Sequence, residues 1–325
     1  MSLPDARPEG VRSMRVAFIG TGVMGRSMAG HLISAGHDVV VHTRTRDRAE
    51  DLLARGASWA ADPASASEGT DVAISMVGLP SDVRDVHLGA RGTLAARQVP
   101  TIIIDMTTSA PSLAVEIASA AARRGSAALD APVSGGDVGA RNATLSIMVG
   151  GDASAVERAR ALLALMGKTI VHHGGPGAGQ YAKLVNQVLV AASMVGVSEA
   201  LAFAGAAGLD PHKVLESVSP GAAGSWTLTN LAPRILKGDM APGFRVEHLV
   251  KDLGIASEEA RARGLSLPGL ELADRLYGAL RAAGQGGLGT QALAPFVAAQ
   301  AQGLAQASGR AQASGAAHGG AQSSL

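Results

Sequence analysis

The 325-residue sequence contains no cysteine, and aromatic residues make up only 2% of it. Without thiols the chain has no disulfide bond, no thiolate nucleophile and no thiolate metal ligand, which fits a reducing cytoplasm. An excess of one charge is also lacking, because 28 Lys and Arg residues balance 27 Asp and Glu residues and leave a net charge of +1. Such a surface offers no field for nucleic acid or an anionic membrane. We therefore expect a cytoplasmic protein with small-molecule partners, no nucleic acid partner and no membrane partner.

Long apolar runs are missing too. No stretch of 18 or more purely apolar residues occurs, and the most apolar segment, 184–207, is interrupted by Asn186, Gln187 and other polar residues. A buried helix explains this segment better than a membrane span. Residues 1–13 are polar, so they lack the apolar stretch of a secretory signal and are predicted to form a flexible extension. Ala, Gly, Ser and Gln dominate 303–325, which predicts a disordered tail.

Hydrophobic residues make up 47% of the chain, which is long enough for two domains of ordinary size. In the first half, short β-branched runs alternate with alanine-rich helical stretches. This alternation is typical of a parallel sheet covered by helices on both faces. The predicted fold class is therefore α/β, with a Rossmann-type doubly wound parallel sheet followed by an all-α domain. We expect strands near 14–20, 38–42, 72–77, 101–105, 127–129, 145–149 and 169–172.

The pattern changes after Gly179, because helical stretches then follow one another to about Gln302 without a further convincing strand. We predict a first domain, with the doubly wound sheet, over residues 14–176. A second, all-helical domain is predicted over 177–302. A helix from about 179 to 207 would span ~40 Å, which is long enough to run between the two domains.

A glycine-rich turn follows the first predicted strand and opens a helix. In a dinucleotide-binding turn the first glycine permits the bend, the second lets pyrophosphate approach the backbone, and the third lets the helix pack on the strand. The phosphate then faces free N–H groups at the helix N-terminus. The position between strand and helix therefore favours a dinucleotide site over a merely glycine-rich loop. The residues of this turn are Gly20, Thr21, Gly22, Val23, Met24 and Gly25.

The end of the second strand indicates which dinucleotide is preferred. An NAD-specific site usually has Asp or Glu there, about 20 residues after the glycines, to bind the ribose 2′-hydroxyl. This chain has Thr43, followed by Arg44 and Thr45. No carboxylate would repel a 2′-phosphate, and the Arg44 guanidinium offers it a fork of donors. We expect NADP(H) to be preferred over NAD(H); in the alternative interpretation, Arg44 and Arg46 are solvated surface charges.

One face of the long predicted helix carries an amine and two amides. Lys183, Asn186 and Gln187 stand at positions i, i+3 and i+4, so they project from the same side. A lysine inside an apolar helix is costly to bury, so it either lies at the surface or serves chemistry. Another segment, 130–136, follows a strand and combines small residues with polar ones.

Five segments of the chain carry a family resemblance. They read VAFIGTGVMG at 16–25, DMTTSAP at 105–111, DAPVSGG at 130–136, GAGQYAKLVNQ at 177–187 and GFRVEHLVKDL at 243–253. In this order they resemble the β-hydroxyacid dehydrogenase family, which includes 3-hydroxyisobutyrate dehydrogenase and tartronate semialdehyde (2-hydroxy-3-oxopropionate) reductase. The likeness runs from about 14 to 299. It implies that 14–176 bind NADP and that 177–302 form a helical domain of the 6-phosphogluconate dehydrogenase type for substrate binding and dimerisation. The Asn-Gln pair at 186–187 is more similar to the tartronate semialdehyde reductase branch.

The resemblance implies that Lys183 is the catalytic residue and that Ser134, Gly135 and Gly136 receive a substrate carboxylate. The residue types agree with this role. When a hydride reaches an aldehyde carbon, the oxygen needs a proton and a positive neighbour, and a lysine supplies both. The resemblance also implies that Asn186 and Gln187 orient substrate or lysine, and that Met76, Val77, Thr108 and Lys251 contact the cofactor.

We therefore expect an NADP(H)-dependent enzyme that interconverts a small 3-oxo acid and its 3-hydroxy acid. The resemblance implies a homodimer or homotetramer. Alternatives within the superfamily are a succinic semialdehyde or glyoxylate reductase and an imine reductase, although imine-reducing relatives generally lack the lysine. A different class of alternative is a non-catalytic NADP-binding interaction module. No HExxH metal motif and no Gly-x-Ser-x-Gly nucleophile elbow occurs, so we expect neither a metal site nor a hydrolase.

Overall fold

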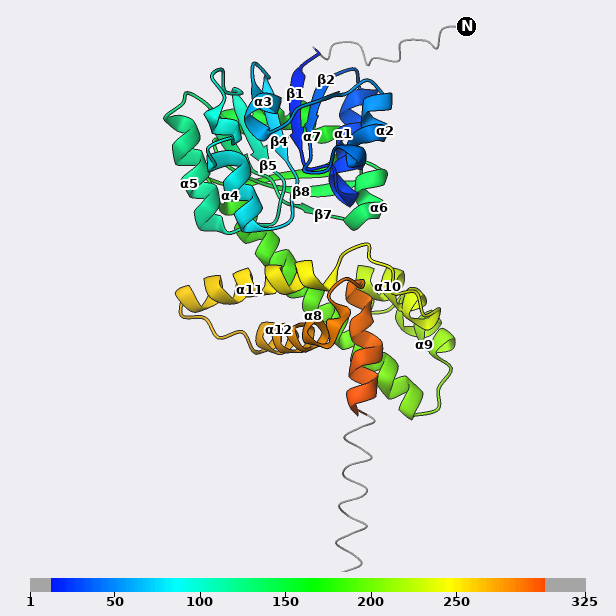
Figure 1. The fold of residues 1–325 in the computed structure, drawn as a ribbon. Coiled ribbons are helices and arrows are strands. Elements are labelled where there is room, and N and C mark those ends of the chain that lie inside the picture. The colour runs from blue at the N-terminus through cyan, green and yellow to red at the C-terminus, as the bar shows by residue number, and fades with distance from the viewer. Residues whose placement is uncertain (1–12, 302–325) are drawn as a thin grey trace, which may run out of the picture. The chain divides into compact units, whose positions relative to one another are not determined.

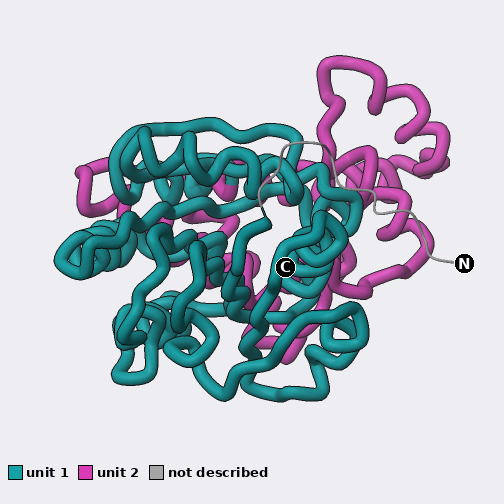
Figure 2. The backbone as a smooth tube through the Cα atoms, turned by 90° about the horizontal axis from the view of Figure 1, so that it is seen from above, with its two compact units in different colours: residues 1–186 teal, residues 187–325 magenta. Residues whose placement is uncertain are grey.

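The computed structural model describes residues 13–301, and the chain divides into two compact units (Figures 1 and 2). Unit 1 ends at Asn186 and unit 2 begins at Gln187, so the division lies within one long helix, α8 (Ala178–Ala206). The predicted boundary between 176 and 177 falls just before this helix begins. Unit 1 alternates strands and helices, whereas the described part of unit 2 is helical.

Unit 1 is built on a nine-stranded sheet with the order β3-β2-β1-β4-β5-β6-β8-β7, and β9 also pairs with β8. Strands β1 to β6 pair in parallel, and β1 lies between β2 and β4. The chain runs from β1 through β2 to β3 on one side, and then returns to the other side of β1 to form β4. This reversal is the point at which doubly wound sheets bind dinucleotides. The strands are β1 (Arg15–Ile19), β2 (Asp38–His42), β3 (Ser58–Trp59), β4 (Val72–Ser75), β5 (Ile102–Asp105), β6 (Ala127–Asp130), β7 (Val133–Ser134), β8 (Leu145–Gly150) and β9 (Gly167–Gly174).

Helices cover the sheet on both faces, as the alternation of its side chains requires. Phe18 of β1 belongs to the apolar cluster that contains Met28 of the first helix, whereas its neighbour Ile19 belongs to the cluster of Val86 in a later helix. The helices of unit 1 are α1 (Val23–Ser34), α2 (Glu50–Ala54), α3 (Pro63–Ser67), α4 (Pro80–Leu88), α5 (Pro111–Ala122), α6 (Gly136–Arg141) and α7 (Ala153–Ala164), with 3₁₀ turns η1 (Arg46–Ala49) and η2 (Thr93–Ala95).

Unit 2 packs its helices around aliphatic side chains and one buried aromatic ring. Tyr277 is fully buried, and its hydroxyl donates to the Thr290 carbonyl at 3.0 Å, so its single polar atom is satisfied. Residues 293–301 form a last described helix. The elements after α8 are α9 (Pro211–Val218), α10 (Trp226–Leu236), α11 (Val246–Ala262), α12 (Pro268–Leu280), the π-helical segment η3 (Arg281–Gln285) and η4 (Thr290–Ala292).

The predicted fold class is confirmed, and the sheet also has a part that the alternation of strands and helices does not indicate. The two-residue strand β7 and the end of β6 pair antiparallel with β8, so the sheet is parallel only in its larger part. Strands as short as β3 and β7 contain too few residues to show a period of two. The predicted extension at 1–13 and tail at 303–325 lie almost wholly outside the described residues.

A buried polar cluster joins the ends of β4 and β5. The Ser75 hydroxyl donates to Asp105 Oδ1 at 2.7 Å and lies 2.8 Å from His87 Nε2, and all three side chains are buried. Burial raises the pKa of Asp105 to about 6, against the opposing hydrogen bonds from Ser75 and Thr107. Burial lowers the pKa of His87 to about 4. The histidine is therefore neutral at physiological pH, while the carboxyl group ionises at an energetic cost.

Because the buried carboxyl group of Asp105 is costly to ionise, we expect Asp105→Asn to change the free energy of unfolding in a pH-dependent way. The raised pKa means that the stabilising contribution of the protonated carboxyl group is complete below about pH 4 and is lost as the pH rises through about 6. Asparagine keeps an acceptor oxygen and carries no charge. We expect the variant to match wild type near pH 4 and to gain up to ~3 kcal/mol in the free energy of unfolding near pH 8, since each pKa unit corresponds to ~1.4 kcal/mol.

Urea unfolding at both pH values measures this difference, and Asp47→Asn, which changes an exposed carboxylate in the same unit, is the control. A stability difference for Asp105→Asn that stays the same at the two pH values would contradict the buried charge.

Candidate active site

The glycine turn after β1 has the geometry of a phosphate-binding turn. Gly20 has φ +99°, and a Cβ there would collide with the carbonyl oxygen of Met76 at the end of β4. A Cβ at Gly25 would collide with the carbonyl oxygen of Gly20, so this glycine lets α1 pack tightly on the turn. Gly22, by contrast, has open space where its side chain would be. The turn thus presents bare backbone at the N-terminus of α1, which fits a pyrophosphate group.

The other members of the turn have different surroundings. Thr21 is buried, and its hydroxyl lies 3.4 Å from the Arg48 carbonyl oxygen. Val23 is 63% exposed, and Met24 packs against the core of unit 1. Thr21 and Met24 therefore stabilise the turn, while Val23 lies on its open side.

The segment after β2 places a guanidinium group in solvent. The side chain of Arg44, between Thr43 and Thr45, is 86% exposed and forms an ion pair of 3.4 Å with Asp82 in the first turn of α4. The Arg46 guanidinium instead lies over the Trp59 ring, 5.8 Å from its centroid. The end of β2 has no carboxylate. However, α4 brings the Asp82 carboxylate to Arg44, a contact that sequence spacing could not show.

Two further loops meet at the same edge of the sheet, after β4 and β5. The Val77 N–H donates to the Thr107 hydroxyl at 3.0 Å, and the Thr107 N–H donates to Asp105 at 3.1 Å. The buried Asp105 cluster therefore holds the loop of Met76 and Val77 against the loop of Thr108. Both loops stand beside the glycine turn, because Gly20 abuts the Met76 carbonyl.

The segment expected to receive a carboxylate connects β6 with α6. Ser134 ends β7, and the next two residues, Gly135 and Gly136, have φ of +131° and +62°. Only glycine adopts such a pair of conformations without strain. A Cβ at Gly136 would meet nothing within 4 Å, so its backbone is open to a ligand.

The helix α8 carries the amine and the amides that we predicted on one face. Lys183 is 7% exposed, Asn186 is half-buried and Gln187 is 1% exposed. Tyr181, Val185 and Leu189, at the intervening positions, are exposed. Over residues 181–189, Lys183 and Gln187 are therefore covered together with Leu184, while Tyr181, Val185 and Leu189 lie on the open side of α8.

Within unit 2, the Gln187 amide donates to Asp252 Oδ2 at 2.6 Å. Lys251 Nζ lies 2.8 Å from the other oxygen of the same carboxylate. Asp252 is almost fully buried, so two donors share its charge. Gln187 thereby links α8 to α11, and this is a structural contact of a residue that we predicted to orient substrate or lysine.

Two residues that our sequence analysis did not assign hold these parts of unit 1 together. The Gln180 amide donates to the Thr107 carbonyl at 2.8 Å and accepts from the Ser109 N–H at 2.9 Å. Asp130 accepts backbone N–H groups from Gly177 and Gln180. Both residues lie within segments that carry the family resemblance. Their burial would have marked them as important, but it cannot be read from the sequence alone. No cluster of three or more potential metal ligands occurs among residues 13–301.

Comparison with known proteins identifies the family of the chain. Residues 15–175 match the model for the NAD-binding domain of 6-phosphogluconate dehydrogenase, and 177–297 match the model for the NAD-binding domain of NADP-dependent 3-hydroxyisobutyrate dehydrogenase. The chain is 51% identical to a 3-hydroxyisobutyrate dehydrogenase-like protein of Arabidopsis thaliana over 280 residues, 86% of this chain and 84% of the relative. The chain belongs to the β-hydroxyacid dehydrogenase family.

The names of further relatives differ. An NAD-dependent L-serine dehydrogenase of Pseudomonas aeruginosa is 41% identical, covering 81% of this chain and 91% of the relative. The 2-hydroxy-3-oxopropionate reductase of Escherichia coli is 39% identical, covering 86% and 96%. The crystal structure of Mycobacterium tuberculosis 3-hydroxyisobutyrate dehydrogenase with L-serine has a TM-score of 0.80 at 32% identity, covering 88% and 99%. The protein is an NAD(P)-dependent hydroxyacid dehydrogenase.

Two glycines of the turn predict different effects of an added methyl group. Gly25→Ala forces the methyl against the Gly20 carbonyl, and we expect it to lower the free energy of unfolding by about 1–3 kcal/mol. Gly22→Ala meets no atom, and its φ of −73° suits alanine, so the fold keeps its stability. The same methyl occupies the approach of a pyrophosphate group, and we expect it to weaken NADPH binding about tenfold or more.

Urea unfolding and NADPH fluorescence titration separate the two effects. A Gly22→Ala variant that binds NADPH as wild type does would contradict the assignment of this turn.

Proposed function

We propose that the protein is an NADP(H)-dependent reductase that converts a small 3-oxo acid to its 3-hydroxy acid, with Lys183 as the proton donor. The observation that carries this proposal is the amine of Lys183, buried on α8 one turn beyond Gln180, which is itself bonded to the 107–109 loop. A semialdehyde with a carboxylate, such as tartronate or methylmalonate semialdehyde, is the substrate class favoured by this set of groups.

The cofactor fits the residues of unit 1 described above. The bare backbone of the glycine turn suits its pyrophosphate, and Thr43, Arg44 and Thr45 lie where the adenine ribose would be bound. Met76, Val77 and Thr108 would border the nicotinamide half, and Lys251 of unit 2 is proposed as a further contact. When bound, the nicotinamide supplies the hydride in reduction and accepts it in oxidation.

Lys183 acts on the substrate oxygen. As an ammonium group it hydrogen-bonds the carbonyl oxygen and stabilises the negative charge that develops there, and it then donates the proton that completes the alcohol. In the reverse direction the neutral amine takes the proton from the hydroxyl. Asn186 and Gln187 would orient substrate or lysine from the same face of α8.

The carboxylate of the substrate is proposed to lie at Ser134, Gly135 and Gly136. The Ser134 hydroxyl and the backbone N–H groups of the two glycines are donors, and the positive φ values turn the backbone sharply without side chains in the way. The names of the relatives also support a small hydroxy acid as the substrate class, since they specify 3-hydroxyisobutyrate, L-serine and 2-hydroxy-3-oxopropionate. The second candidate, a succinic semialdehyde or glyoxylate reductase, would use the same groups.

Replacement of Lys183 tests the activity. Lys183→Met keeps the length of the side chain but removes the amine, and we expect kcat/KM to fall at least about 100-fold, as for the loss of a general acid. NADPH affinity should change by less than about twofold. The measurement is NADPH oxidation with tartronate, methylmalonate and succinic semialdehydes and glyoxylate, and NADP⁺ reduction with 3-hydroxyisobutyrate and L-serine.

Lys168→Met, which changes an exposed lysine in β9, is the matched control and should leave turnover unchanged. Two results would overturn the proposal: wild type that turns over no member of the panel, or Lys183→Met with wild-type activity.

Arg44 is proposed to select NADP(H). We expect Arg44→Ala to reduce the preference for NADPH over NADH by about tenfold, because a charge-assisted bond to the 2′-phosphate is lost. Asp82→Asn removes the carboxylate that pairs with Arg44 and should keep or strengthen that preference. Arg46→Ala, which removes the cation stacked on Trp59, should leave it unchanged.

The ratio of kcat/KM for the two cofactors is the quantity to measure in all three variants. An unchanged ratio in Arg44→Ala would show that this guanidinium is only a surface charge.

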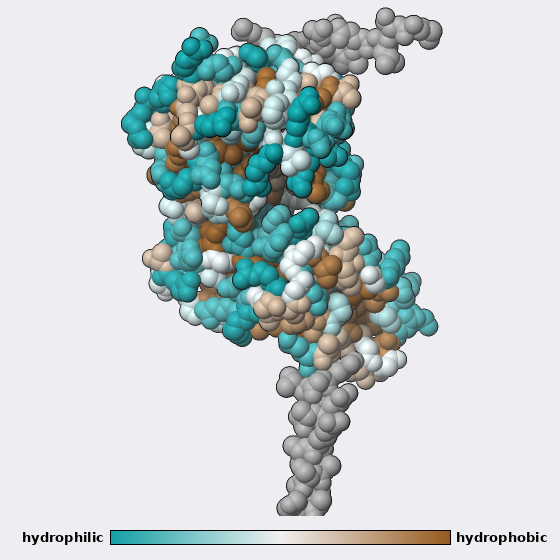
Figure 3. Space-filling view, viewed as in Figure 1, coloured by the Kyte–Doolittle hydropathy of each residue, from teal (hydrophilic) through white to brown (hydrophobic). Residues whose placement is uncertain are grey.

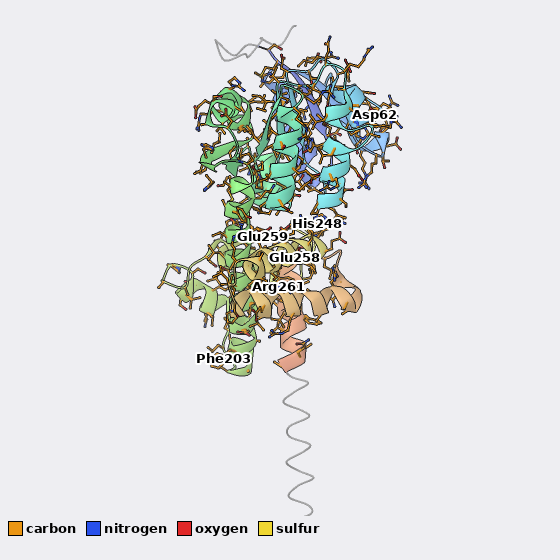
Figure 4. All side chains as sticks on the ribbon, turned by 90° about the vertical axis from the view of Figure 1, so that its left-hand side faces the viewer. Asp62, Phe203, His248, Glu258, Glu259 and Arg261 are labelled. Carbon is orange, nitrogen blue, oxygen red and sulfur yellow. The ribbon has the colours of Figure 1, made fainter. Side chains whose placement is uncertain are left out.

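We also propose that the protein is cytoplasmic and forms a homodimer or homotetramer. Val185 and Leu189 are 63% and 64% exposed on α8, and Phe203 projects from the same helix with 75% exposure (Figure 4). Hydrophobic side chains also interrupt the hydrophilic surface of unit 2 over α9 and α10 (Figure 3). Among the described residues α8 alone has the length and composition of a membrane span, a test that core helices of globular proteins also pass.

A further inference from the structure

The carboxylate of Asp130 caps the first turn of α8. Its Oδ1 accepts the Gly177 N–H and its Oδ2 accepts the Gln180 N–H, both at 2.8 Å. The residue is 3% exposed. The charge is therefore held by the free N–H groups and the positive dipole end of a 29-residue helix. Burial raises the pKa of Asp130, and these backbone hydrogen bonds oppose the rise.

The contact leaves no room between the helix and the sheet. A Cβ at Gly179 would collide with the carbonyl oxygens of Asp130 and Met148, and a Cβ at Gly150 would collide with the Asp130 carboxylate. The first turn of α8 therefore lies directly on the ends of β6 and β8. A helix seated this closely has little room to shift along the sheet.

Asp130 is also where the substrate loop begins. It is the last residue of β6, and Ser134 follows four residues later. On the helix side, Lys183 follows Gln180 by three residues, a rise of ~4.5 Å along α8. One carboxylate thus joins the base of the loop proposed to hold the substrate to the base of the helix that carries the proposed proton donor.

We propose that Asp130 is a positioning residue that sets the place of the Lys183 amine relative to the substrate loop. This inference rests on the proposed function of Lys183. The carboxylate acts through the helix, since its two oxygens are occupied by backbone N–H groups of the first turn. A shift of α8 by about 1 Å moves the amine off the substrate oxygen, and misplacement of this size lowers rates by up to about 100-fold.

The test is a double-mutant cycle with Asp130→Asn and Lys183→Ala, measured as kcat for steady-state NADPH oxidation with the best substrate of the panel. Asparagine is isosteric but turns an amide toward one of the N–H donors. We expect Asp130→Asn to lower kcat 10- to 100-fold while the Kd for NADPH stays within about twofold. In the Lys183→Ala background the same change should have less than about a twofold effect, because no amine remains to be placed.

Asp152→Asn is the matched control, since Asp152 caps α7 through the Ala155 N–H at 2.9 Å and α7 carries none of the proposed site residues. Its kcat should equal that of wild type. If Asp130→Asn does not fold, Asp130→Ser, which keeps one acceptor in a smaller side chain, has the same expected outcome.

The outcomes separate this inference from the proposed function. Full activity in Lys183→Ala overturns the role of the lysine, and with it this inference. Loss of activity in Lys183→Ala with wild-type kcat in Asp130→Asn overturns only the positioning role. Effects that multiply in the double variant also overturn it, because Asp130 would then act independently of the lysine.

Discussion

The rest of the proposed active site depends on the contact between the first turn of α8 and the ends of β6 and β8. At this point a buried carboxylate, two backbone N–H groups and two glycines replace side-chain packing. Apolar packing alone would fix the position of a long helix along its axis only weakly, because alanine and valine contacts are nearly equivalent along its length. Directional bonds to one charge remove that freedom and give the lysine on this helix a defined position.

Close contacts between backbone groups also shape the edge of unit 1 where the cofactor is expected to bind. The Met76 carbonyl lies against Gly20 of the glycine turn, and the Val77 N–H donates to the Thr107 hydroxyl. The buried Ser75–His87–Asp105 cluster accepts the Thr107 N–H through Asp105 and so fixes the Thr107 loop. A chain with few aromatics achieves rigidity here through hydrogen bonds. The energetic cost is a carboxyl group with a raised pKa in the core.

Most of the fold and much of the candidate site could be predicted from the sequence. The β-branched runs and the GxGxxG spacing are local patterns, and each produced the expected strand or turn. Contacts between distant residues produce the antiparallel strand β7, the ion pair of Arg44 with Asp82, the cap made by Asp130 and the bonds of Gln180 to the 107–109 loop. Gln187 had the spacing of a site residue, yet its amide bonds Asp252, which spacing alone does not reveal.

The central claim is that the chain reduces a small 3-oxo acid by hydride transfer assisted by Lys183. The most direct measurement uses NADPH deuterated at the transferred position of C4 and mass spectrometry of the product formed from tartronate or methylmalonate semialdehyde. The account predicts one deuterium on the carbon that carries the new hydroxyl group with wild type, and almost no product with Lys183→Met. An unlabelled product, or labelled product formed by Lys183→Met at the wild-type rate, would contradict it.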